Sequence, residues 1–199
     1  MVHFTLFGIP VYIRPSFWVV LAIFGGALSI SSVEDLIYPA LFVIAGFIAI
    51  LSHEMGHALV GRRLGGGQQT IVLELFGGLT SSHGMQLTRG GRALMILAGP
   101  MMTLLLGIIS LWLTWNIVAP VMASHNLDFW DLAISPFTAA LISPKLYILS
   151  CLIMIGEWWT LLNLLPIYPL DGGQLIAQYI RSPRKVFMTG FITAIQIGR

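Results

Sequence analysis

The chain places two histidines and a glutamate, His53, Glu54 and His57, inside a long run of apolar residues. On a helix, residues four apart lie on one face with β-carbons about 5 to 6 Å apart, so both imidazoles would point the same way. Two neutral imidazoles can bind a divalent cation, and a neighbouring carboxylate can act as a general base. The pattern H-E-x-x-H therefore predicts a zinc centre with hydrolytic chemistry. The alternative is a pair of histidines that hydrogen-bond to neighbouring helices.

A catalytic zinc centre needs a third protein ligand and an open coordination position. The candidate is Asp171, which lies in the segment N-L-L-P-I-Y-P-L-D-G-G-Q, residues 163–174. Two prolines in this segment end the preceding apolar run. The alternative role for Asp171 is to cap the helix that G-G-Q-L-I begins. The second and fourth apolar runs would cross a membrane in the same direction, so their ends would meet on one side, and this favours the metal role.

The composition determines which solvent surrounds these elements. The chain has 199 residues, of which 57% are hydrophobic and only 9% are charged, whereas about 25% of the residues of a soluble domain are charged. This balance indicates a membrane protein. The single cysteine, Cys151, excludes a disulfide framework within the chain.

Four apolar runs are long enough to cross a hydrocarbon core, which takes about 20 helical residues. They cover residues 16–33, 36–61, 93–118 and 146–168. A fifth run, from Val186 to Arg199, is too short to span a membrane. We expect it to be the first part of a further transmembrane helix that the sequence does not complete. The expected fold is an all-α polytopic membrane protein with about four complete transmembrane helices, a partial fifth and a small β-hairpin or sheet on the cytoplasmic side. We expect residues 1–199 to form a single membrane-embedded domain.

The cations indicate the orientation. Eight lie in the N-terminal segment or in the loops after the second and fourth runs, while Lys145 alone lies in the loops on the other side. The eight are Arg14, Arg62, Arg63, Arg89, Arg92, Arg181, Arg184 and Lys185. The positive-inside rule then places the N-terminus and the opening of the site in the cytoplasm, and we expect a multi-pass protein of the plasma membrane. Topology explains these scattered cations fully, so we expect lipid headgroups and no nucleic acid as partners.

One loop has strand-like rather than helical character. Residues 68–88 contain β-branched residues followed by Gly77 and Gly78, which predicts a hairpin dipping toward the membrane. Its edge would offer main-chain hydrogen bonds to an extended substrate, with the two glycines at the binding surface. Proline at Ile71 or Leu73 would test this role. The alternative is a hairpin without a part in binding.

Together these motifs resemble the site-2 protease family of intramembrane zinc metalloproteases. The likeness rests on H-E-M-G-H within an apolar run and on N-x-x-P-x-x-P-x-D-G-G about a hundred residues later. The opening G-I-P-V-Y-I-R-P-S-F and L-A-G-P at residues 97–100 are also similar to the family. One departure is Thr103, where the family often has an asparagine.

The resemblance implies roles for individual residues. His53, His57 and Asp171 would bind one zinc ion per chain, and Glu54 would be the catalytic acid and base. Asn163 would hold or polarise the substrate, which would be a transmembrane segment of another protein. The rival hypothesis is a zinc-binding membrane protein without proteolysis, such as a transporter or an inactive relative. The two hypotheses differ at Glu54, because zinc binding does not require this carboxylate. The oligomeric state stays open.

Overall fold

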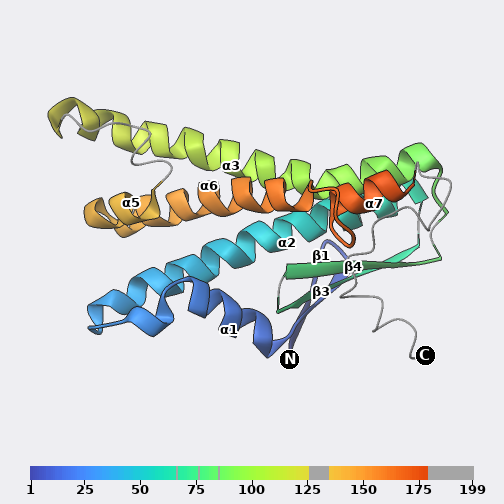
Figure 1. The fold of residues 1–199 in the computed structure, drawn as a ribbon, viewed down its shortest axis with the longest axis horizontal. Coiled ribbons are helices and arrows are strands. Elements are labelled where there is room, and N and C mark those ends of the chain that lie inside the picture. The colour runs from blue at the N-terminus through green and yellow to red at the C-terminus, as the bar shows by residue number, and fades with distance from the viewer. Residues whose placement is uncertain (66, 76, 85, 126–134, 179–199) are drawn as a thin grey trace.

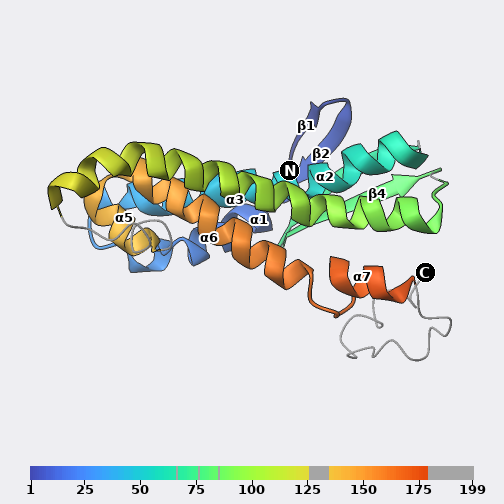
Figure 2. The ribbon, with the colours of Figure 1, turned by 90° about the horizontal axis from the view of Figure 1, so that it is seen from above.

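In the described residues, three long helices lie side by side and form most of the structure (Figure 1). The computed structural model describes residues 1–65, 67–75, 77–84, 86–125 and 135–178. The long helices are α2 (Ile37–Gly65), α3 (Arg89–His125) and α6 (Pro144–Asn163). Two shorter helices, α5 (Pro136–Ile142) and α7 (Asp171–Ala177), lie near opposite ends of the bundle (Figures 1 and 2). A small sheet lies beside the end of the bundle where α2 finishes.

The long helices have the length and composition that a membrane crossing requires. The apolar stretches within the described residues are Glu34–Gly65, Arg89–Ile117 and Pro144–Asn163. At about 1.5 Å per residue, even the shortest of them reaches the roughly 30 Å of a hydrocarbon core. Many large apolar side chains point away from the protein, as expected of helices surrounded by lipid. On α3 they include Met101, Leu104, Leu105, Ile108 and Trp112.

The expected first span, residues 16–33, is wrong as a single helix. Helix α1 (Pro15–Phe24) has ten residues, about 15 Å, which is half of a hydrocarbon core. Gly25 and Gly26 follow, and Gly26 has a φ of 86° that a helix does not allow. The chain then forms two 3-10 turns, η1 (Ala27–Ser29) and η2 (Glu34–Leu36). Three of the four predicted spans are therefore long helices, and the partial fifth lies outside the described residues.

In the described residues the sheet has four strands, where the sequence predicted a hairpin or small sheet. They are β1 (Val2–Leu6), β2 (Ile9–Ile13), β3 (Gln68–Glu74) and β4 (Gly77–His83), arranged in the order β1-β2-β3-β4. The predicted hairpin is correct, since β3 and β4 pair antiparallel. The N-terminal hairpin was not predicted. Its turn consists of Phe7 and Gly8, both with positive φ, which is the backbone that a tight two-residue hairpin needs.

One face of the sheet packs against α2 and α1. Strand β2 runs parallel to β3, with Val11 opposite Ile71, and Ile71 lies opposite Thr80 of β4. Because side chains alternate along a strand, these three residues share one face. Val11 and Ile71 belong to a buried cluster that includes Phe17, Leu21, Ile50, Met55 and Ala58 of the helices. The sheet is thereby held against the half of α2 that contains His53, Glu54 and His57.

Candidate metal centre and cleft

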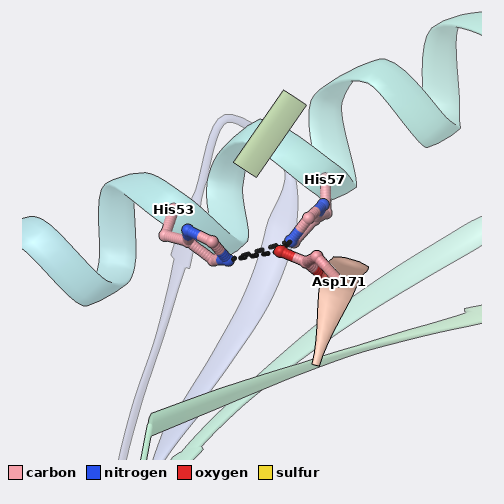
Figure 3. A group of neighbouring side chains, drawn as sticks. All are labelled: His53, His57 and Asp171. Carbon is pink, nitrogen blue, oxygen red and sulfur yellow. Dashed lines mark hydrogen bonds and ion pairs between the residues drawn. The ribbon is translucent and has the colours of Figure 1, made fainter. Parts of the chain in front are cut away.

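The two histidines lie one turn apart on α2 with their rings turned toward the same point (Figure 3). Their Nε2 atoms are 3.1 Å apart. The Nδ1 atom of His57 lies 2.8 Å from the carbonyl oxygen of Met95, on α3. A carbonyl can only accept, so Nδ1 carries the proton and Nε2 presents its lone pair. Ligand imidazoles in metal sites commonly make such a bond with the other ring nitrogen.

The carboxyl of Asp171 completes the group from the far end of the chain (Figure 3). Its Oδ2 atom lies 3.1 Å from Nε2 of His53 and 3.3 Å from Nε2 of His57. The capping alternative for Asp171 is wrong, because Leu170 is the N-cap of α7 and Asp171 is its first residue. A β-carbon on Gly172 or Gly173 would collide with the main chain of the preceding turn. These glycines therefore allow α7 to fold back closely and bring Asp171 to α2.

The geometry of these three atoms fits a metal ion. Donors at roughly 2.0 to 2.1 Å from a tetrahedral zinc ion would be about 3.3 Å from one another, close to the 3.1 to 3.3 Å seen here. The three residues are at most 8% exposed. Lone pairs that meet at this distance repel, so the arrangement calls for a cation or a proton between them.

The charge on Asp171 suits this role. Burial raises the pKa of its carboxyl, but the two imidazoles, when they carry a proton on Nε2, lower it by more through hydrogen bonds and ionic attraction. The net pKa lies below its ordinary value, so the group is an anion at neutral pH. An anionic oxygen together with two imidazole nitrogens is a usual ligand set for catalytic zinc.

Helix α3 approaches the ligands closely because it has glycine at the contact. A β-carbon on Gly99 would overlap both imidazoles, and one on Gly56 of α2 would overlap the main chain of Ala98. Thr103, one turn further along α3, is fully buried. Its hydroxyl lies 2.8 Å from that of Thr160 on α6 and donates to the carbonyl of Pro100 at 3.0 Å. Thr103, which stands where the family often has an asparagine, therefore joins α3 to α6 through a hydrogen bond between hydroxyls.

Glu54 is buried beside the ligands and contacts the sheet. The hydroxyl of Thr80, on β4, donates to Oε2 of Glu54 at 2.7 Å and also lies 3.2 Å from its main-chain oxygen. A β-carbon on Gly78 would overlap the carboxyl group of Glu54. Strand β4 therefore forms one wall around this carboxylate, and the glycine leaves the space that it occupies.

All the predicted site residues line one cleft of about 670 Å³. Binding sites for small ligands commonly have volumes of roughly 300 to 1,000 Å³. The walls come from α1, α2, the β3–β4 hairpin, the start of α3 and the segment from α6 to α7. The residues predicted from sequence that line it are His53, Glu54, His57, Gly77, Gly78, Asn163 and Asp171.

Thr80, Trp159 and Gly99 are residues around the site that were not predicted. Trp159 accepts the amide of Asn163 on its main-chain oxygen at 2.9 Å, and its ring would be too close to a β-carbon on Gly77. The indole Nε1 of Trp159 is buried without a hydrogen-bond partner in the described part of the chain. Thr80 and Trp159 have no motif around them, whereas Gly99 belongs to the L-A-G-P segment.

This fold and this site define a class: a helical membrane protein with two histidines and one carboxylate placed so that they could hold a metal ion. A family model described as Peptidase family M50 matches residues 41–198. That match covers more than half of the chain, which therefore belongs to this family, the family of the site-2 proteases.

Several relatives agree with this assignment. The chain is 26% identical to a zinc metalloprotease of Methanocaldococcus jannaschii over 98% of the chain and 50% of the relative. It is 28% identical to a putative zinc metalloprotease of Synechocystis, over 98% of the chain and 48% of the relative. A putative zinc metalloprotease of Mycobacterium tuberculosis is 31% identical over 76% of the chain and 34% of the relative.

The fold agrees as well. A site-2 protease structure from Methanocaldococcus jannaschii matches with a TM-score of 0.61 and 24% identity, over 89% of this chain and 70% of that one. The chain spans about half the length of the first two curated relatives. With its family and its long apolar helices, the protein is an integral membrane protein of a zinc peptidase family.

Proposed function

We propose that this chain is an intramembrane zinc metalloendopeptidase that cuts peptide bonds in or near transmembrane segments of other proteins. The observation that carries the proposal is a single cleft in which Glu54 lies beside the His53, His57 and Asp171 group. A site that only bound zinc would need the three ligands but no buried carboxylate beside them.

The side chains divide the chemistry between them. His53, His57 and Asp171 would hold one zinc ion per chain, which would supply the Lewis acidity that activates water at neutral pH and polarises a carbonyl. Glu54 accepts the proton from the attacking water on its Oε1 atom and then delivers it to the leaving amine. Asn163 lies on the cleft wall and its amide nitrogen donates to the main chain of Trp159. Its amide oxygen and remaining N–H would hold the scissile segment.

The proposed substrate is an extended segment that adds to the outer edge of β4. The sheet order leaves β4 with a neighbour on one side only within the described residues, whereas β3 has β2 and β4 beside it. Proline at Ile71 or Leu73 therefore does not test this edge, because both residues lie on β3, which is paired on both sides. A helical substrate has its amides bonded internally, so an open strand edge would stabilise the unwound form that hydrolysis needs.

The residues that face outward follow from the pairing. The carbonyl of Leu73 accepts from the main-chain nitrogen of Arg14 at 2.9 Å, so Leu73 faces β2. Main-chain groups alternate along a strand, so Val72 faces β4, where it lies opposite Leu79. By the same alternation, Gly78, Thr80 and Ser82 direct their amide and carbonyl groups away from β3.

Ser82→Pro tests the strand-edge proposal. It removes one outward amide and leaves the groups that pair with β3, and proline is tolerated on edge strands. We expect kcat/KM for a membrane substrate to fall about 3- to 10-fold, the usual effect of one lost hydrogen bond. Ser82→Ala is the matched control, since it removes the hydroxyl that contacts Gln69 but keeps the amide. Equal kcat/KM values for the two variants would contradict substrate binding at this edge.

We further propose that the site opens to the cytoplasm of a plasma-membrane protein and that residues 1–199 act as one domain. Five of the eight cations, Arg14, Arg62, Arg63, Arg89 and Arg92, belong to the described residues and lie at or next to the ends of α1, α2 and α3. This arrangement supports a cytoplasmic sheet and cleft. The other three lie outside the described residues.

Removal and return of zinc tests the function directly. The purified full chain, reconstituted in liposomes with a panel of single-span substrate proteins, is expected to cut at least one of them. A chelator should stop this cleavage, and one equivalent of Zn²⁺ per chain should restore it, because the proposed centre holds a single ion. Zinc binding at one equivalent without cleavage of any substrate would instead support the non-proteolytic alternative.

A further inference from the structure

We infer that Thr80 is a positioning residue that links substrate docking to the orientation of Glu54. This inference rests on the proposed function, because it concerns how the acid and base of that reaction is held. Thr80 is half-buried on β4, and its hydroxyl lies within hydrogen-bond distance of both the carboxylate and the main-chain oxygen of Glu54. It contacts neither the metal ligands nor, in the described structure, any other side chain through this hydroxyl.

The bond assigns different tasks to the two oxygens of Glu54. Oε2 accepts from Thr80 at 2.7 Å, an ordinary length for a hydroxyl hydrogen bond. The carboxylate is then held in one orientation, and Oε1 stays available to accept the proton from water. Without the hydroxyl, Glu54 would have no donor from β4 on Oε2 and could turn between several orientations. The expected cost falls on the chemical step rather than on substrate binding.

The same residue faces the substrate through its main chain. The side chain of Thr80 shares the inner face of the sheet with Ile71, its partner on β3, while its amide and carbonyl point to the open edge by the alternation derived above. A segment that pairs with the edge at Thr80 would therefore fix the strand that holds Glu54. Gly78, two residues earlier on the same face, leaves space for the carboxylate, so β4 can lie this close to α2.

Substitutions at Thr80 separate a positioning role from a structural one. Thr80→Val keeps the β-branched shape but removes the donor, and we expect kcat to fall about 10- to 100-fold, as for a lost hydrogen bond to a charged group. KM and the zinc content should stay within about twofold of the wild-type values. Thr80→Ser keeps the hydroxyl and should recover most of kcat. Thr70→Val, on the neighbouring strand β3, is the matched control and should behave as wild type.

An infrared measurement tests the contact without relying on activity. The carboxylate band of Glu54, isolated by subtracting the spectrum of Glu54→Gln, should shift in Thr80→Val and stay in place in Thr80→Ser. If the wild type cuts no substrate, the proposed function fails, while this band still decides whether Thr80 holds Glu54. If the wild type cuts and Thr80→Val keeps its kcat, or if Thr80→Ser fails to recover it, the inference is overturned and the proposed function stands.

Discussion

Glu54→Gln is expected to lower the cleavage rate of a reconstituted membrane substrate by about 100- to 10,000-fold, the usual contribution of a general acid and base. Glutamine has nearly the same shape and can still accept the Thr80 hydroxyl through its amide oxygen, so the contact with β4 survives. It cannot take the proton from water at neutral pH. The three proposed zinc ligands are unchanged, so the zinc content should remain one ion per chain.

The control for this variant is Glu34→Gln, which removes an exposed carboxylate near the start of α2. Its cleavage rate and zinc content should both match the wild type. Cleavage by Glu54→Gln at the wild-type rate would show that the proton transfer occurs elsewhere. Loss of zinc from Glu54→Gln would show that this carboxylate belongs to the metal site.

Asp171→Ala is expected to weaken zinc binding by more than about 100-fold and to abolish cleavage. Mutation of residues that merely support a ligand weakens metal binding about 10- to 100-fold, and Asp171 is proposed to bind the ion itself. Its carboxylate is also the negative charge within 3.1 to 3.3 Å of the two imidazole nitrogens. Titration of the metal-free protein with Zn²⁺, with bound metal measured by mass spectrometry, would give the affinity.

Glu74→Gln is the matched control for the loss of a charged carboxyl. Glu74 forms an ion pair with Arg14 at 2.8 Å, and both side chains are well exposed. An exposed pair of this kind contributes about 0 to 1 kcal/mol to stability, so zinc affinity and cleavage should not change. Wild-type zinc affinity in Asp171→Ala would mean that the third ligand is another group.

Most of the proposed centre could be predicted because its residues follow local patterns. His53 and His57 are four apart on a helix, and that spacing alone places two imidazoles on one face. Asp171 was predicted from its place after the fourth apolar run, on the side where the second run also ends, and the structure brings its carboxyl to the same point. The β3–β4 hairpin was predicted from β-branched residues that end at paired glycines.

The wrong or missing predictions concern segments whose structure depends on glycines within an apolar run or on pairing with a distant strand. The apolar run at residues 16–33 was long enough to span, but Gly25 and Gly26 end the helix after Phe24. The N-terminal hairpin was not predicted because its turn is Phe7-Gly8 and not one of the Asn-Gly or Asp-Gly pairs that usually mark such a turn. Strand β2 is fixed by parallel pairing with β3, and about fifty residues of helix and turn separate the two in the sequence. A short-range sequence pattern does not predict a strand partner that is so distant in the sequence.

The amino-acid sequence by itself determined the solvent, the helices and the identity of the proposed ligands, because hydrophobicity and helical spacing act over neighbouring residues. Only the tertiary structure decided which strand is open, that Gly99 and Gly78 leave space against the imidazoles and the carboxylate, and that Thr80 reaches Glu54. These contacts join segments that meet only after the helices and the sheet have packed. Their distances depend on that packing, which composition and residue spacing do not predict.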